Sequence, residues 1–467
     1  MEAGREPHRI GRDSRAGSAE VRPVLALWLS LAFVMPGVAA EELEIIVWAN
    51  ATANERYRTE GVALAAAILN EELKVEGRDT RVRITQQTWR GRSSWEQMKQ
   101  AFVLAVEAGR GPHIIVAGHE DIPVWGRAGL IQPIEQLADL DRYPFNDVFA
   151  NLWPIMSWNG QIWGVPQDAE ARPLFVWIPH LRAIGWTSEQ IQSLPERIVR
   201  GEYSLQNLLR DARKMQDAGV VKPGYGFYPR PRKTPDFWQF YKSFGGEFFD
   251  ARRGRLVLDA AALRAFYQFF HDAVFVYEVT RKNHIGTNQE RWFAEVAGGQ
   301  VGFWQGGTWH YARYTRGEAL RDFFDKVAFA LVPAGRPGGQ AVTLTHPLAY
   351  LVSRRALGET ADICARLIAI VTEPRMNTLH AIASAHLGIT HAQTQLEMYA
   401  SDRWTAETTA LLEHAFALPN IPEFGRYDRV VWQGLLATWS GSATPGQAVE
   451  TVVRELQATM SNMVIIK

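Results

Sequence analysis

The chain has 467 residues, a formal net charge of zero at pH 7 and a single cysteine. This length predicts two or more domains, because single hydrophobic cores stop growing at about 250–300 residues. The balanced charge gives no overall attraction to nucleic acid or anionic membranes, and the 47% hydrophobic and 21% charged content is that of a globular protein. One cysteine excludes an intrachain disulfide and a multi-cysteine metal site, and the apolar neighbours of Cys364 indicate that it packs on a buried helix face.

The N-terminus has the pattern of a signal peptide. An apolar stretch at 24–35 is followed by the small residues Val38-Ala39-Ala40, which predicts a signal peptide over 1–40 with cleavage near Ala40. An uncleaved anchor helix is the alternative, and the mixed charges of the first twenty residues leave a translation start near Val21 open. No later run of 18 apolar residues follows, so we expect a soluble protein exported to the periplasm.

The first part of the mature chain alternates predicted strands with amphipathic helices. Strands are predicted at 43–48, 82–85 and 114–117, and apolar residues recur at helical spacing between them, at Val62, Ala66, Leu69 and Leu73 and at Trp95, Met98, Phe102 and Val106. This alternation favours βαβ units and a parallel sheet covered on both faces. Because ligands bind beyond the carboxyl ends of such strands, we expect binding residues in 49–54, 86–93 and 118–121.

The rest of the chain changes character. Tryptophans are frequent between 153 and 186, and a proline- and glycine-rich loop with a basic run covers 223–236. A helix is predicted around Leu263, Tyr267, Phe270 and Val274, a strand at 327–332, and mainly helices from Asp362 onward.

The segment 298–310 places Trp304 and Trp309 in a glycine-rich turn that is predicted to open a helix. Glycine allows a ligand to approach the backbone closely, and an indole offers a flat apolar face with one N–H donor. Such a face suits the C–H side of a sugar ring. The alternative is that both indoles fill the core.

Several motifs occur in a fixed order over residues 42–456. Gly109–Val116 is similar to G-x-G-P-D-[IV]-x-x, and Asn159–Pro166 is similar to N-G-K-x-Y-G-x-P. Four further segments belong to this set of motifs: Ala128–Ile134, Leu174–Trp177, Gly299–Trp309 and Leu418–Pro422. Together they resemble the extracellular solute-binding proteins of ABC importers, particularly the carbohydrate-binding group around maltose-binding protein. The chain departs from the family pattern at His113, at Gln300-Val301 and at Val176-Trp177.

The resemblance implies an α/β, two-lobed periplasmic-binding-protein fold, in which each lobe is a mainly parallel sheet flanked by helices. We expect the N-terminal lobe at 41–170 plus 346–372 and the C-terminal lobe at 171–345 plus 373–467, joined by crossing hinge strands around a cleft that closes on its ligand. The implied function is capture of a sugar or sugar-like solute and delivery to permease subunits with associated ATPases. The resemblance also implies that the protein is a monomer and needs neither a cofactor nor a metal.

Carried over position by position, the resemblance suggests ligand contacts in both lobes. In the first lobe these are Asn50, Trp89, His119 and Asp121, and at the crossing between the lobes they are Asp168 and Glu170. A turn or surface role is the alternative for Asp121, an exposed cover for Trp89, and a solvated hinge for the crossing pair.

In the second lobe the resemblance suggests Trp309 first, as an aromatic that stacks on the ligand. The further candidates are Trp238, Trp304, Arg426 and Tyr427. For the aromatic residues the alternative is core packing, and for Arg426 with Asp428 it is a surface salt bridge.

Two other functions stay open. A periplasmic enzyme is one, although none of the twelve histidines falls in H-E-x-x-H, His119-Glu120 has no partner histidine nearby in the sequence, and a G-x-S-x-G elbow is absent. Asp168 and Glu170 could still act as the acid and base of a glycosidase. A binder of a phosphorylated sugar or polyol is the other, because the basic run Arg230-Pro231-Arg232-Lys233, with Arg90 and Arg92, suits a phosphate.

Overall fold

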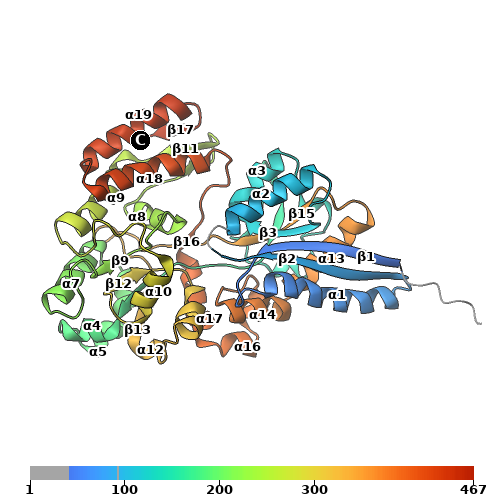
Figure 1. The fold of residues 1–467 in the computed structure, drawn as a ribbon, viewed down its shortest axis with the longest axis horizontal. Coiled ribbons are helices and arrows are strands. Elements are labelled where there is room, and N and C mark those ends of the chain that lie inside the picture. The colour runs from blue at the N-terminus through green and yellow to red at the C-terminus, as the bar shows by residue number, and fades with distance from the viewer. Residues whose placement is uncertain (1–40, 92–93) are drawn as a thin grey trace, which may run out of the picture. The chain divides into compact units, whose positions relative to one another are not determined.

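The structure is a computed structural model that describes residues 41–91 and 94–467 (Figure 1). The predicted signal peptide and its cleavage near Ala40 lie outside the described residues. Arg92 lies outside them as well.

The first lobe is built on a six-stranded sheet in the order β2-β1-β3-β15-β4, with β7 also paired to β15. The predicted parallel arrangement is confirmed for β1 with β2 and β3, whereas β15 runs antiparallel to β3, β4 and β7. The strands are β1 (Glu41–Asn50), β2 (Thr80–Trp89), β3 (Ile114–Gly118), β4 (Ile131–Gln132), β7 (Gly164–Pro166) and β15 (Leu348–Ser353), and a small hairpin joins β5 (Ser157–Trp158) to β6 (Gln161–Ile162).

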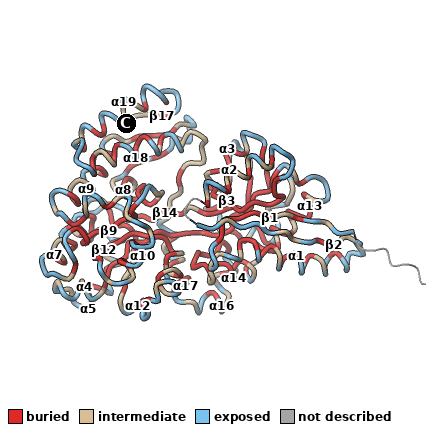
Figure 2. Tube along the Cα trace, viewed as in Figure 1, coloured by how far each residue is buried: buried red, intermediate tan, exposed pale blue. Residues whose placement is uncertain are grey.

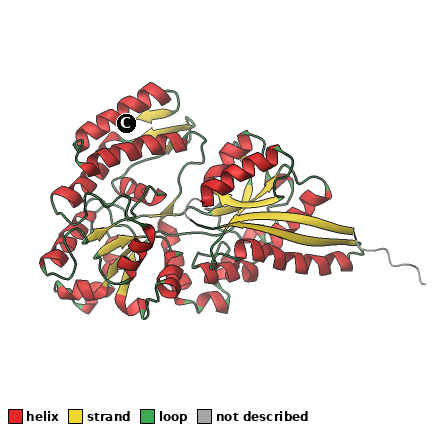
Figure 3. Ribbon diagram, in the orientation of Figure 1, coloured by secondary structure: helices red, strands yellow, loops and turns green. Residues whose placement is uncertain are grey.

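Helices cover both faces of this sheet because successive side chains of each strand point to opposite faces (Figure 3). Val47 packs on the face of α1 (Tyr57–Val75) and α13 (Glu359–Thr372), and Trp48 packs on the face of α2 (Ser94–Glu107) and α3 (Ile122–Arg127). Cys364 is fully buried on α13, as predicted.

The second lobe contains a four-stranded sheet in the order β13-β8-β12-β9. β8 (Leu174–Trp177) runs antiparallel to β12 (Phe303–Gln305) and β13 (Val327–Ala330), and β12 runs parallel to β9 (Phe227–Tyr228). Around it lie α4 (Ile178–Ala183), α5 (Ser188–Gln192), α6 (Leu194–Val199), α7 (Leu205–Asp217), α8 (Trp238–Ser243), α9 (Ala260–Phe275), α10 (Gln289–Ala297), α11 (His310–Ala312) and α12 (Phe323–Lys326).

The C-terminal part of the chain is mainly helical, as predicted from Asp362 onward. It comprises α14 (Pro374–Ser384), α15 (His391–Thr394), α16 (Glu397–Ala400), α17 (Arg403–Thr409), α18 (Phe424–Ser440) and α19 (Pro445–Met460). β17 (Val464–Ile466) joins β11 (Arg255–Leu258) and β10 (Phe249–Asp250) in a three-stranded sheet.

The chain passes from the first sheet to the second between β7 and β8, at residues 167–173. It returns between β14 (Thr343–Leu344) and β15, and β14 pairs in parallel with β16 (Ala415–Phe416). Each residue from 163 to 177 is buried, and the tube of this stretch is red in Figure 2. The polar side chains of this crossing are therefore removed from water.

The buried apolar side chains gather in three clusters. One collects residues of the second lobe, from Leu174 to Leu344 with Trp404 and Tyr427, and the other two cover the faces of the first-lobe sheet. Leu387 packs in a first-lobe cluster although it follows residue 373. The lobe boundaries proposed from the sequence remain a prediction. Among the described residues, no helix has both the length and the apolarity needed to cross a membrane.

The sequence predicts a single glycine-rich turn for segment 298–310, and the structure differs from this prediction in part. Trp304 lies in the middle of strand β12, and only Trp309 precedes a helix, the short α11. β-sheet pairing of Phe303 and Trp304 with β8 and β9 overrides the glycines on both sides.

Gly302 lies where two backbone segments approach each other, and we expect Gly302→Ala to destabilise the second lobe. A Cβ atom there would stand 2.4 Å from the carbonyl oxygen of Gly226 and 2.8 Å from Met215 Sδ, so we expect a loss of about 1–3 kcal/mol of unfolding free energy. Gly425→Ala is the matched control, since a Cβ there meets no atom within 4 Å. Urea unfolding measures both; equal stability of the two variants would contradict the crowding argument.

Candidate functional site

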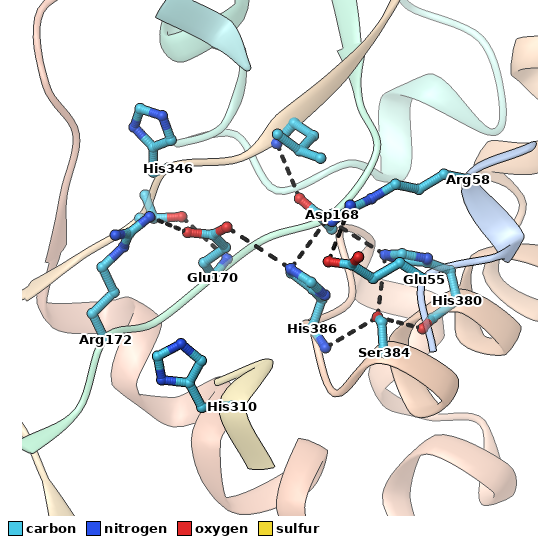
Figure 4. A network of polar contacts seen from close by, with 12 residues as sticks. Glu55, Arg58, Asp168, Glu170, Arg172, His310, His346, His380, Ser384 and His386 are labelled. Carbon is cyan, nitrogen blue, oxygen red and sulfur yellow. Dashed lines mark hydrogen bonds and ion pairs between the residues drawn. The ribbon is translucent and has the colours of Figure 1, made fainter. Parts of the chain in front are cut away.

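The crossing between β7 and β8 carries three charged side chains at alternate positions, Asp168, Glu170 and Arg172 (Figure 4). The Arg172 guanidinium donates to Glu170 Oε2 and to Asp236 Oδ2, each at 2.7 Å. These three partners are at most 7% exposed. Because buried charges are costly unless paired, this ion-pair network fixes the crossing against the start of α8.

The buried groups have strongly shifted ionisation. Burial, with the negative charge of Asp168, raises the pKa of Glu170 to about 7 in spite of Arg172. Burial opposes ionisation of Asp168 as well, but His386, His380 and Arg58 hold its pKa below the ordinary value. Asp168 is therefore the permanently charged carboxylate of the pair, and Glu170 changes its protonation near neutral pH.

Trp309 lies next to this network and is half-buried. Its ring stacks on His386, with centroids 5.5 Å apart and an interplanar angle of 9°, and Arg172 Cζ lies 4.9 Å from the ring centroid. The indole is thus held between the crossing segment and the loop after α14.

Several buried polar atoms around Trp309 make no hydrogen bond within the described part of the chain. They are Arg172 Nε, Asp236 Oδ1, Gln305 Oε1, Thr308 Oγ1 and His310 Nδ1. The groups are neighbours, since Gln305 Nε2 donates to the Asp236 carbonyl oxygen at 2.7 Å and Arg230 Nη1 lies 2.7 Å from His310 Nε2. Buried polar groups in native proteins nearly always find partners, so this set is suited to a polar ligand.

The candidates of the first lobe lie in two places. His119 Nε2 is 3.1 Å from His346 Nδ1, and Lys99 Nζ lies 2.8 Å from Asp121 Oδ2. Burial and the charge of Glu120 raise the pKa of Asp121 to about 7 against the effect of Lys99. His119 has no partner histidine nearby in the sequence, but the fold supplies His346 from the loop before β15.

The side chains of Asn50 and Trp89 contact other residues of the first lobe. Asn50 Nδ2 donates to Ser94 Oγ at 2.5 Å, and Asn50 is only 5% exposed. Trp89 is half-buried against Trp48, with ring centroids 4.8 Å apart.

Three candidates of the second lobe are packed in its core. Trp304 is fully buried, stacks on Phe175 and donates to Tyr314 Oη at 3.1 Å. Trp238 and Tyr427 are also buried and stack on each other. Arg426 is exposed. The packing of these three aromatic residues is the core packing given as the alternative in the sequence analysis, because their indole and phenol faces are covered by protein.

Sequence reasoning missed Arg172, Asp236, Gln305, His310 and His386. Arg172 had a signal, since it continues the every-second-residue pattern of Asp168 and Glu170 in an extended segment. His386 had none, because it reaches the site from more than two hundred residues further along the chain.

The family is decided by comparison with known proteins. Residues 57–351 match the profile of the bacterial extracellular solute-binding proteins. The chain belongs to this family. No curated protein sequence matches this solute-binding protein.

Solved structures share its fold. Over 89% of this solute-binding protein and 100% of the other chain, it is similar to maltose-bound MalE3 of T. maritima, with 17% identity and a TM-score of 0.71. The GacH receptor of Streptomyces glaucescens GLA.O has 14% identity and a TM-score of 0.71 over 90% and 99% of the two chains. The maltose/maltodextrin-binding domain MalE of Bdellovibrio bacteriovorus, bound to maltotriose, has 16% identity and a TM-score of 0.67 over 90% and 100%. These matches confirm the two-lobed α/β fold.

We expect Asp236→Asn to destabilise the protein by about 3 kcal/mol, because Arg172 then keeps only one carboxylate partner in a buried position. The matched control is Asp217→Asn, which breaks the exposed Arg213–Asp217 pair on α7 and should cost less than about 1 kcal/mol. Chemical denaturation of both variants measures the difference. A cost for Asp236→Asn as small as that of the control would show that the ion-pair network does not hold the crossing.

Proposed function

We propose that this solute-binding protein captures a sugar or sugar-like solute at Trp309 and delivers it to the permease of an ABC importer with associated ATPases. One observation carries the proposal: a half-buried indole stands among buried polar atoms that have no partner in the described residues. A sugar needs both features, an aromatic surface for its C–H face and polar groups for its hydroxyls.

The polar groups around Trp309 suit hydroxyl recognition. The carboxylate of Asp236 accepts hydrogen bonds, the Arg172 guanidinium donates them, and the Gln305 amide oxygen accepts a further one. The family and the sugars named with its structural neighbours, maltose and maltotriose, support this class of solute.

The proposed mechanism is closure of the lobes around the solute. A ligand favours the closed form only if it contacts that form better than the open one. The crossing segment is suited to this, because Asp168 faces His380 on α14 whereas Arg172 faces Asp236 in the second lobe. Small-angle scattering should show compaction when a bound solute is added.

We further propose the location, the oligomeric state and the non-catalytic role of the protein. The protein is exported to the periplasm, acts as a monomer and performs no catalysis on its solute. Turnover of a candidate sugar would contradict the last point.

A phosphorylated sugar or polyol is the second candidate. Arg230 favours it, because its guanidinium is buried beside His310 and has no carboxylate at ion-pair distance within residues 41–91 and 94–467. Arg90, Arg232 and Lys233 are exposed. The affinity for a phosphorylated solute should fall as ionic strength rises, whereas that for a neutral sugar should hardly change.

We expect Trp309→Ala to weaken binding of the solute at least tenfold, because the stacking surface is lost. A calorimetric screen with maltose, maltotriose, monosaccharides, polyols and sugar phosphates identifies the solute and then measures this loss.

Trp186→Ala is the matched control. Trp186 is likewise half-buried in the second lobe and has an arginine, Arg197, 5.4 Å from its ring centroid, but it follows α4 away from the crossing. Unchanged affinity in Trp309→Ala, or equal losses in both variants, would contradict the placement of the solute at Trp309.

A further inference from the structure

Three side chains converge on one buried point beside the candidate solute site (Figure 4). Asp168 Oδ2 lies 3.4 Å from His380 Nε2 and 3.7 Å from His386 Nε2. None of these side chains is more than 3% exposed. Two imidazoles and a carboxylate are ligands that zinc and similar divalent transition metals accept.

The spacing of the three ligand atoms fits one ion. Zinc binds nitrogen and oxygen at about 2.0–2.2 Å, so the ligand atoms of a tetrahedral site stand about 3.3–3.6 Å apart. Both measured distances from Asp168 Oδ2 agree with this range to within about 0.1 Å, and the three ligand atoms all lie within 4.8 Å of one another.

The backbone holds these ligands in place. Ala169 and Leu387 exchange two hydrogen bonds, of 3.0 and 2.8 Å, in an isolated antiparallel bridge. The residues next to such a pair project to the same side, so His386 shares one side with Glu170, directly opposite it, and with Asp168, which is diagonal to it. Asp168 Oδ1 accepts from the Leu348 amide at 3.0 Å, which fixes the carboxylate.

The third ligand, His380, comes from the last turn but one of α14. Ser384, one turn later, donates to the His380 carbonyl oxygen at 2.7 Å, so this end of the helix is tied down. Rigid placement of ligands on three backbone segments is what a metal site requires.

Asp168 Oδ2 makes no hydrogen bond within the described residues, although it is buried. Arg58 Nη2 is 3.7 Å away, but the Arg58 guanidinium lies closer to Glu55, at 3.1 Å. A buried carboxylate oxygen without a hydrogen bond is costly, and a bound cation would satisfy it.

We propose that Asp168, His380 and His386 form a binding site for zinc or a chemically similar divalent transition metal. Glu170 lies beside this site, with its Oε1 3.8 Å from His386 Nε2. The site is independent of the identity of the solute. It also gives Asp168 a role other than the sugar contact expected from the sequence.

A second group, His119, Glu120 and His346, is less suited to one ion. His119 lies against Nδ1 of His346 whereas Glu120 lies against Nε2, on the other side of the same ring, and Lys99 takes up the other oxygen of Glu120. This second group therefore supplies the control.

The test uses the untagged protein, stripped with a chelator and dialysed against Zn²⁺ or Co²⁺. We expect one tightly bound equivalent by elemental analysis, visible absorption bands of four-coordinate Co²⁺, and a melting temperature raised by roughly 3 °C or more with Zn²⁺ but not with Mg²⁺. Wild-type protein that retains no ion overturns the proposal whether or not any variant folds.

His386→Asn and Asp168→Asn should each abolish retention of the ion, after circular dichroism has established that they are folded. His346→Asn should retain it. Retention that persists in folded His386→Asn, or that is lost in His346→Asn, places the ion elsewhere and overturns the assignment. Solute binding to the metal-free protein tests the proposed function separately.

Discussion

The structure depends on compensating the charges that the crossing segment carries into the interior. Asp168, Glu170 and Arg172 lie on a stretch in which every residue is buried, so water cannot solvate them. Glu170 and Arg172 pair with each other, and the remaining partners come from other elements: Asp236 before α8, His380 on α14 and His386 after it. An apolar crossing would need no such partners.

These partners are in contact with both lobes, which is why the crossing and the candidate site coincide. Arg172 reaches toward the second lobe and also covers Trp309, whereas Asp168 reaches toward α14, which packs on α1 of the first lobe. A solute that contacts Trp309 therefore lies against side chains fixed by both halves of the protein. Movement of one lobe relative to the other must change the surroundings of that solute.

The fold could be predicted well where periodicity is strong. The spacing of Val62, Ala66, Leu69 and Leu73 identified α1, and the runs at 43–48 and 114–117 identified β1 and β3. Trp304 was harder, because the flanking glycines suggested a turn whereas pairing with β8 and β9 makes a strand.

The site could be predicted where a local motif points to its residues, and Trp309 was found in this way. Asp168 and Glu170 were found because they follow a recognisable motif. His346 and His386 join their partners through tertiary contacts across very long stretches of chain, and no local pattern encodes such a contact.

The alternation of side chains along the crossing has an evolutionary consequence. Asp168, Glu170 and Arg172 occupy every second position of an extended segment, so one residue inserted or deleted between two of them would turn those two to opposite sides. Their contacts with partners in other elements could then not all be kept, and no single substitution elsewhere would restore them. Length changes in this short stretch should therefore be far rarer among homologous chains than substitutions in it, which makes the crossing a natural anchor for aligning distant relatives.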